Sequence, residues 1–318
     1  EEIGEFTANA TYDDDGNLID AVPKNLVVGK GKIDGKKVAV TADDFTIRGG
    51  SSETAAPEKM VFIENYALNK RMPLVRLVDA AGGSIKLLEQ NQSTKIPGYS
   101  GWDMGEILGK IPVASAALGP CAGLGAVKVV MSHFSVMVKG KSQLFAGGPQ
   151  VVLPGVKERI DKEELGGYKV HAYSSGLVNN VAENEEDAFN QIKKFLSYMP
   201  RSVFHLPPVE KSSDPTDRRE DELASIVPRE KRRIYDIKKI LKAVFDKDSL
   251  FEISPYYGRS QITMLGRLNG YSVGILANDP KFFGGAMTLE SGQKFTRFVD
   301  LCDTFNIPII NFMDQPGT

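Results

Sequence analysis

Residues 115–152 read SAALGPCAGLGAVKVVMSHFSVMVKGKSQLFAGGPQVV, and this segment decides the fold. An apolar run at 111–118 leads into it and predicts a buried strand that ends at Gly119-Pro120. A second apolar run at 134–138 predicts another buried strand. Small residues follow both runs. Because open α/β sheets bind ligands beyond the carboxyl ends of their strands, the segment predicts an α/β fold with a binding site at these strand ends.

The small residues that follow the two strands form two loops with few side chains. The first loop, at 121–126, combines two glycines with two alanines at the predicted start of a helix, so its backbone N–H groups can approach an oxyanion. The second loop consists of Phe145, Ala146, Gly147 and Gly148 and ends at Pro149. Either loop alone also fits a tight turn or a close contact between a helix and a strand. Their occurrence together, at two strand ends, favours a binding site.

Composition narrows the class of protein. The chain has 318 residues, of which 42% are hydrophobic and 25% are charged, as is ordinary for a globular protein of about two domains. A formal net charge of -2 gives no overall attraction for nucleic acid or anionic membranes. No apolar run is long enough for a transmembrane helix, and the acidic start resembles neither a signal peptide nor a transit peptide. We therefore expect neither a nucleic-acid nor a membrane partner.

The cysteines and histidines do not predict a metal site. Cys121 and Cys302 are far apart and match no metal-binding spacing, which favours a reducing, cytoplasmic setting. Cys121 is either a nucleophile, which would need a nearby histidine, or a small buried residue, and burial is the favoured reading. The three histidines form no metal-binding pair, and we interpret them as structural or surface residues: His133, His171 and His205.

The remainder of the chain reads as alternating strands and helices. Residues 1–28, which contain a turn signal at 13–16, predict an extended lead-in, and a hairpin follows with a turn at 31–35 and a strand at 37–42. A helix at 55–70 and a strand at 74–78 complete a βαβ unit, which ends in a third small-residue loop at 79–83. Further helices are predicted at 182–199 and 236–245. Residues 209–235 are dense in charge, and they favour a solvated linker.

The chain contains an internal repeat. Residues 31–82 align without a gap on 266–317, at an offset of 235 residues, and eleven of the 52 positions are identical. Most of the identities fall on turns and strand ends, which predicts two copies of one α/β lobe joined by the charged linker. Since Thr318 corresponds to Gly83, we expect a second lobe that stops before its own counterpart of the 121–126 loop.

These segments together resemble the carboxyltransferase (beta) subunit of biotin-dependent acyl-CoA carboxylases, the propionyl-CoA and methylcrotonyl-CoA carboxylase family. The resemblance covers nearly all of 26–318 and rests on motifs in a specific order: GKGKIDGKKVAVTADDFTIRGGS, LVDAAGG, GPCAGLGAV, MVKGKSQLFAGGPQVV, EELGG, LANDPKFFGG and FVDLCDTFNIPIINFMDQPG. It implies a crotonase-like (ClpP/crotonase) superfold with two repeated lobes. The implied domains are a lead-in at 1–25, an acyl-CoA lobe at 26–208, a charged linker at 209–235 and the start of a biotin-side lobe at 236–318.

The resemblance implies a reaction that moves a carboxyl group from carboxybiotin to the α-carbon of an acyl-CoA through a thioester enolate. The family needs no metal, because backbone N–H groups stabilise the negative charges, at about 3 to 4 kcal/mol for one such donor. The family's oxyanion pair falls on Gly123, Leu124 and Gly125, with Leu124 where relatives have glycine. The family motif Asp-Ser-Gly-Gly-Ala-Arg-Ile falls on 79–85, with Gly82 and Gly83 as catalytic glycines and without the arginine.

The resemblance also assigns binding residues. The loop at 42–50 corresponds to the segment that wraps the CoA adenine, with phosphate contacts from Arg48 or nearby lysines. The implied substrate-binding residues are Asp44, Phe45, Arg48, Gly49 and Gly50 for CoA and Phe145, Ala146, Gly147 and Gly148 beside them, and the implied biotin-side residues are Gly284 and Gly285.

The implied partners are a biotin carboxylase with its biotin carboxyl carrier protein, and a homo-oligomer, namely a hexamer built from head-to-tail dimers. The implied location is the cytoplasm, or the mitochondrial matrix for a chain whose transit peptide has been removed. Three other functions remain open: the α subunit of a biotin-dependent decarboxylase, a crotonase-type hydratase or isomerase, and a non-catalytic CoA-binding scaffold. The sequence does not select the acyl-CoA.

Overall fold

The computed structural model describes residues 1–83, 99–230 and 233–317, and the chain divides into two compact units. Unit one comprises residues 1–171 and 181–193, and unit two comprises 172–180 and 194–318. These boundaries differ from the four domains expected from the sequence. Residues 194–208, which the sequence assigns to the first lobe, belong to unit two by their contacts.

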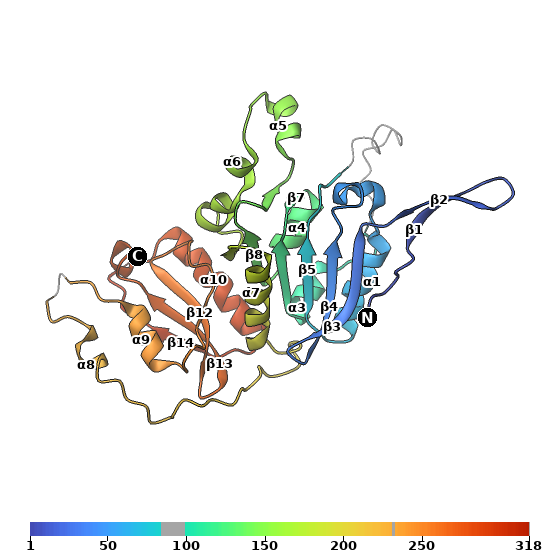
Figure 1. The fold of residues 1–318 in the computed structure, drawn as a ribbon. Coiled ribbons are helices and arrows are strands. Elements are labelled where there is room, and N and C mark those ends of the chain that lie inside the picture. The colour runs from blue at the N-terminus through green and yellow to red at the C-terminus, as the bar shows by residue number, and fades with distance from the viewer. Residues whose placement is uncertain (84–98, 231–232, 318) are drawn as a thin grey trace. The chain divides into compact units, whose positions relative to one another are not determined.

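A six-stranded sheet forms the centre of unit one, in the order β10-β8-β6-β5-β4-β3 (Figure 1). The pair β3–β4 is antiparallel, whereas β4, β5, β6 and β8 run parallel, so the carboxyl ends of these four strands lie at one edge of the sheet. The strands are β3 (Leu26–Ile33), β4 (Lys36–Asp43), β5 (Leu74–Val78), β6 (Val113–Ala117), β8 (Phe134–Val138) and β10 (Asn180–Ala182), and a separate pair is formed by β7 (Pro120–Ala122) and β9 (Gln143–Phe145).

Helix α1 (Pro57–Asn69) provides much of the core of unit one. Its residues Met60, Ile63 and Ala67 are buried against apolar side chains of β3, β4, β5 and β6. Burial of these side chains supplies the main driving force for packing the crossover helix on the sheet. The other helices in or entering this unit are α3 (Met104–Lys110), α4 (Leu124–Val130), α5 (Pro149–Val156), α6 (Lys162–Gly166), the π-helix η3 (Lys169–Ser174) and α7 (Glu185–Tyr198), with the short 3₁₀ turns η1 (Arg48–Gly50) and η2 (Ser52–Thr54).

The first residues form a hairpin where the sequence predicts an extended lead-in. Strands β1 (Ala8–Tyr12) and β2 (Leu18–Pro23) pair antiparallel and extend away from the six-stranded sheet (Figure 1). The predicted turn at Asp13 is present, since its carboxylate accepts hydrogen bonds from the N–H groups of Asp15 and Asn17. Pairing across that turn explains why the segment is a hairpin and not a single extended strand.

Unit two contains a four-stranded sheet in the order β11-β12-β13-β14. Its core lies between this sheet and α9, whose Ile237 and Leu241, together with Phe245 directly after the helix, pack with residues of β12 and β13. Strands β12 and β13 are buried on both faces, as expected for a sheet covered by helices. The elements are α8 (Leu223–Ile226), α9 (Ile237–Val244), β11 (Phe251–Glu252), β12 (Gln261–Leu268), β13 (Tyr271–Asn278), η4 (Phe283–Gly285), α10 (Leu289–Thr304) and β14 (Ile309–Phe312).

The internal repeat is present in the structure. Strands β12 and β13 and turn η4 have the bounds of β3, β4 and η1 displaced by 235 residues, and the strand register is repeated too. Thus Gly31 pairs with Val38, and the corresponding Gly266 pairs with Val273. Helix α10 and strand β14 follow in the places of α1 and β5.

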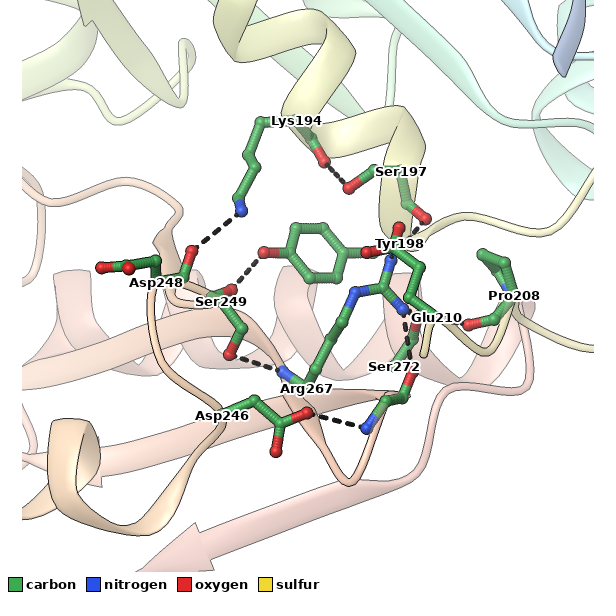
Figure 2. A network of polar contacts seen from close by, with 11 residues as sticks. Lys194, Ser197, Tyr198, Pro208, Glu210, Asp246, Asp248, Ser249, Arg267 and Ser272 are labelled. Carbon is green, nitrogen blue, oxygen red and sulfur yellow. Dashed lines mark hydrogen bonds and ion pairs between the residues drawn. The ribbon is translucent and has the colours of Figure 1, made fainter. Parts of the chain in front are cut away.

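The first part of the charged segment 209–235 is held by unit two. The guanidinium of Arg267 donates to the carbonyls of Pro208 (3.2 Å) and Ser197 (3.0 Å) and forms an ion pair with Glu210 (Figure 2). The hydroxyl of Tyr198 donates to the carbonyl of Ser249 in the same network. The sequence predicts a solvated linker here, but these contacts bind the start of the segment to the β12–β13 hairpin.

Candidate active site

The glycine loops after the parallel strands of unit one lie against one another. The loop at 44–50 follows β4, the loop at 79–83 follows β5, and residues 118–123 follow β6. Backbone hydrogen bonds join them, from Ala81 N–H to the carbonyl of Gly49 (3.2 Å) and from Ala122 N–H to the carbonyl of Ala80 (2.9 Å). Three segments that are remote in sequence therefore form one surface at the sheet edge where α/β folds bind ligands.

The loop at 121–126, which we call the elbow, leads into helix α4. Gly123 has φ 55° and ψ −118°, a backbone conformation open to glycine, and its N–H donates to the carbonyl of Phe145 (3.0 Å). That N–H is therefore not available to bind a ligand. The first turn of a helix leaves N–H groups without intrahelical acceptors, and no side chain caps α4. The donors that remain at the elbow are those of Leu124, Gly125 and Ala126.

Close packing explains why glycines occupy these loops. A Cβ atom added to Gly125 would lie 3.1 Å from Cβ of Ala80, and one added to Gly82 would lie 3.0 Å from Cβ of Ala122. A Cβ at Gly119 would overlap the carboxylate of Asp79, at 2.2 Å from Oδ1. The glycines thus let the loops approach one another, and this contact requirement holds whatever ligand binds there.

Buried charges lie at the same strand ends, and sequence reasoning missed them. Lys128 of α4 donates from Nζ to both carboxylate oxygens of Asp43, each at 2.9 Å, and both side chains are 8% exposed. Asp79 donates from its N–H to Oδ2 of Asp43 (3.3 Å), while its own Oδ1 is buried without a hydrogen-bond partner in the described part of the chain. Burial, and then the charge of Asp43, raises the pKa of Asp79 to about 6.

A second buried ion pair holds the carboxyl end of α4. Arg76 donates from Nε and Nη2 to the two carboxylate oxygens of Glu64, both at 2.8 Å, and both side chains are fully buried. Its Nη1 donates to the carbonyls of Lys128 (3.3 Å) and Met131 (2.8 Å), and Trp102 donates to Glu64. A single arginine inside the apolar strand LVRLV was the one signal of this cluster in the sequence.

The loop that the sequence assigns to CoA is a turn with left-handed residues. The carboxylate of Asp44 accepts from the N–H and the hydroxyl of Thr46, at 2.9 and 2.6 Å. Arg48, Gly49 and Gly50 have φ of 52°, 64° and 64°. Phe45 and Arg48 are exposed at this edge, where a ligand can reach them.

The second small-residue loop leads into α5. Phe145 and Gly148 contact each other, because a Cβ at Gly148 would lie 3.3 Å from the Phe145 ring, and Ala146 is exposed. A Cβ at Gly147 would lie 3.3 Å from Val151 of α5. Helix α5 is largely exposed despite its apolar sequence, with Val151, Leu153 and Val156 on its surface.

The glycines assigned to the biotin side lie in unit two. Gly284 and Gly285 have φ of 62° and 86°, and the carbonyl of Gly285 accepts from Nδ2 of Asn278 (2.8 Å). Asn278 also accepts from the N–H of Asp314 (3.0 Å), as Asp43 accepts from Asp79 in unit one. Of the 79–85 motif, Ser84 and Ile85 lie outside the described residues, and so does Thr318.

Both cysteines are buried structural groups, whereas the three histidines are only partly buried. Cys121 and Cys302 are unpaired and fully buried, and burial raises the pKa of each thiol to about 12. Burial lowers the pKa of His133 to about 4, and its Nδ1 accepts from the N–H of Val113 (3.0 Å). Among the described residues, no cluster of His, Cys, Asp and Glu has the arrangement of a metal site. No described helix is long and apolar enough to cross a membrane.

The fold is that of an α/β protein whose glycine loops gather backbone groups at one edge of the sheet, and the comparisons identify the family. The model of the carboxyl transferase domain matches residues 3–318, so the chain belongs to the carboxyl transferase family. This confirms the resemblance read from the motifs.

The relatives are carboxylase and decarboxylase subunits. The chain is 38% identical over 295 residues to the mitochondrial propionyl-CoA carboxylase beta chain of Homo sapiens, covering 92% of this chain and 54% of the relative. It is 35% identical over 296 residues to the methylmalonyl-CoA decarboxylase subunit alpha of Veillonella parvula, covering 92% and 57%. The chain thus spans about half the length of these relatives.

Among solved structures, the transcarboxylase 12S hexamer with hydrolysed methylmalonyl-coenzyme A bound is similar over the whole chain. The TM-score is 0.86 at 30% identity, and the match covers 100% of this chain and 62% of that one. The α/β fold predicted from the sequence is therefore confirmed.

Proposed function

We propose that the protein transfers a carboxyl group between carboxybiotin and the α-carbon of an acyl-CoA, as a carboxyltransferase subunit of a biotin-dependent acyl-CoA carboxylase. The observation that carries the proposal is the family match over residues 3–318. The propionyl-CoA carboxylase beta chains among the relatives support an acyl-CoA substrate. The transcarboxylase structure with bound methylmalonyl-coenzyme A points to the same class of ligand.

In this proposal the loops of unit one bind the thioester and stabilise the enolate. Leu124 and Gly125 provide N–H donors for the oxyanion, while Gly123 fixes the elbow through its hydrogen bond to Phe145. Each such donor contributes about 3 to 4 kcal/mol to lowering the barrier. Gly82 borders the elbow through Ala122 and Gly83 follows it in the same loop, and the loop that contains Asp44, Arg48 and Gly50 contacts the CoA portion.

The remaining contacts of the proposal concern biotin and the assembly. Carboxybiotin, held on a partner carrier protein, supplies the carboxyl group and the base. Gly284 and Gly285 of unit two belong to its binding side. A biotin carboxylase is the second partner, and a hexamer of head-to-tail dimers is the proposed assembly, in the cytoplasm or the mitochondrial matrix. The hexamer named for the transcarboxylase core supports an oligomer.

The runner-up is a decarboxylase α subunit, for which the Veillonella parvula relative is the specific support. That enzyme class removes the carboxyl group from the acyl-CoA at a similar site. The two functions separate by the direction of net transfer, when the full-length protein is supplied with carboxylated carrier protein in one assay and with methylmalonyl-CoA in the other.

The test of the proposal is carboxyl transfer from carboxybiotin to a panel of acyl-CoAs by the full-length protein. Gly125→Pro removes one proposed N–H donor. The position lies in the first turn of α4, where a helix tolerates proline, although the proline side chain would contact Ala80 closely. We expect about 100-fold or greater loss of turnover with an unchanged circular dichroism spectrum. The control is Gly109→Ala in α3, where an added Cβ meets open space. Unaltered turnover in Gly125→Pro would remove the elbow from the mechanism.

A further inference from the structure

Asp43, Asp79 and Lys128, three ionisable residues, lie together at the strand ends next to the elbow. Lys128 forms its ion pair with both oxygens of Asp43, and the N–H of Asp79 donates to the same carboxylate. The carboxylate of Asp79 packs over the backbone of Gly119, and its Oδ1 is buried without a partner among the described residues. The Lys128–Asp43 pair is thus nearly excluded from water and Asp79 beside it is half-buried, and electrostatic interactions are stronger in such an environment than in water.

The cluster joins the parts of the proposed site. Asp43 is the last residue of β4 and directly precedes the loop at 44–50. Asp79 begins the loop at 79–83, and Lys128 lies in α4, two residues beyond the elbow. Its ion pair therefore links the helix that follows the elbow to the start of the proposed CoA loop, across 85 residues of sequence.

Unit two shows that the backbone arrangement does not need these charges. There, Asn278 occupies the position of Asp43 and accepts from the N–H of Asp314 at 3.0 Å, as Asp43 accepts from Asp79 at 3.3 Å. A neutral amide thus suffices to hold the loop after the strand. Burying a charged pair without need is costly, so the charge at residue 43 suggests a use beyond holding the loop.

We propose that Asp43, Asp79 and Lys128 are positioning residues that set the location and the local charge of the elbow, and thereby the rate of enolate formation. The inference rests on the proposed function. Lys128 fixes α4 against the end of β4, and its charge balances that of Asp43. Protonation of Asp79 then determines whether the cluster carries an additional negative charge next to the elbow, whose N–H groups stabilise the enolate.

The charge state of the cluster changes in an accessible pH range. Burial raises the pKa of Asp79 to about 6, and Asp43 adds to this effect. Above that pH an ionised Asp79 opposes the negative charge that develops on the thioester oxygen, so the turnover number falls as the pH rises through about 6. The charge of Lys141 lowers the pKa of Asp79, and that of Glu185 raises it. The charged or titratable groups around Asp79 are Asp43 of β4, Lys128 of α4, Cys121 of β7, Lys141 after β8 and Glu185 of α7.

The test is the pH profile of kcat for the full-length protein in the reverse direction, from methylmalonyl-CoA to free biotin. Asp43→Asn removes the neighbouring negative charge and should move the midpoint to lower pH. Lys128→Met leaves the charge of Asp43 without its partner and should move the midpoint to higher pH, and each shift should be up to about one pH unit. Asp79→Asn should abolish this step of the profile. The KM for methylmalonyl-CoA should change much less than kcat in these variants.

Two controls separate electrostatics from packing. Lys128→Arg keeps the charge and should keep the wild-type midpoint, and Lys110→Met removes an exposed lysine whose partner is Glu106 and should alter nothing. If Lys128→Met fails to fold, the pH profile of Asp43→Asn alone tests the inference. That variant should fold, because unit two has an asparagine at the equivalent position. Midpoints that coincide with wild type, or that move in one direction for both variants, overturn the inference. A wild-type protein without any transfer activity contradicts the proposed function itself, and the inference falls with it.

Discussion

The two copies of the repeat share a backbone but differ in what they bury. Strands β3 and β4 match β12 and β13 residue for residue at the 235-residue offset. Yet the buried charges Asp43, Glu64 and Arg76 of unit one correspond to Asn278, Val299 and Asn311. The comparison shows that the two copies share their turns and strand ends, whereas each of these buried charges occurs in one copy only. The buried charges of unit one lie around α4.

The largest expected difference between the copies concerns Arg76. Arg76→Met leaves Glu64 buried without its cation, which we expect to lower the free energy of unfolding by about 3 to 5 kcal/mol. Asn311→Met, at the corresponding and exposed position of unit two, should change it by less than about 0.5 kcal/mol. Urea unfolding followed by circular dichroism measures both. Equal losses would show that the ion pair contributes nothing specific to unit one.

The next difference is reversed, because here unit two buries the charge. Lys294 is 4% exposed, and burial lowers the pKa of its ammonium group to about 8, whereas Lys59 at the equivalent position is not buried. The unfolded chain binds the proton more tightly, so the free energy of unfolding should rise as the pH increases from about 8 to 10.5, by up to about 3 kcal/mol. Lys294→Met should remove this rise. Unfolding titrations at several pH values test it, with Lys59→Met as the control that should retain the rise.

A smaller difference concerns the second glycine of the turn in each copy. A Cβ on Gly50 would lie 2.5 Å from the carbonyl oxygen of Asp79, and one on Gly285 would lie 3.1 Å from that of Asp314. Both residues have positive φ, so alanine strains both turns. The overlap in unit one adds to the strain there, and we expect Gly50→Ala to cost about 1 to 3 kcal/mol more than Gly285→Ala. Thermal unfolding of the two variants gives the difference, and a larger cost at Gly285 would contradict it.

The smallest expected effect lies in the network of unit two. Tyr198→Phe removes the hydroxyl that donates to the carbonyl of Ser249 and should lower the free energy of unfolding by about 0.5 to 1.5 kcal/mol (Figure 2). Tyr271→Phe provides a matched loss of a hydroxyl from a tyrosine of unit two that is 58% exposed. A loss no larger than in that control would mean that water replaces the bond to Ser249.

The sequence predicts the elements better than the contacts between them. Apolar runs predict β5 and β8 with their observed bounds, and helical spacing predicts α9 to within a residue at each end. At the offset of the repeat, the strand predicted at 37–42 corresponds to 272–277, which lies within β13. These features depend on local patterns of apolar residues and turns, which short segments of sequence contain.

The buried ion pairs and the anchored linker could not be predicted in the same way. Lys128 and Asp43 are 85 residues apart, and no local spacing relates them. Arg267 and Glu210 belong to a strand and to a segment whose charge pattern is typical of solvated chain. Such pairs form only when elements distant in sequence pack together. A charged residue in the sequence alone does not specify whether its side chain faces water or an ion-pair partner.

The burial of both cysteines also has a practical consequence for experiments. The sequence contains two cysteines, and both are fully buried with thiols whose pKa is raised to about 12. A thiol reacts with alkylating reagents through its thiolate, so neither should label in the folded protein. A cysteine introduced at Asp14, in the exposed turn of the β1–β2 hairpin, would then be the single reactive thiol of these 318 residues. The native chain thus suits site-specific attachment of fluorophores and cross-linkers without removal of its own cysteines.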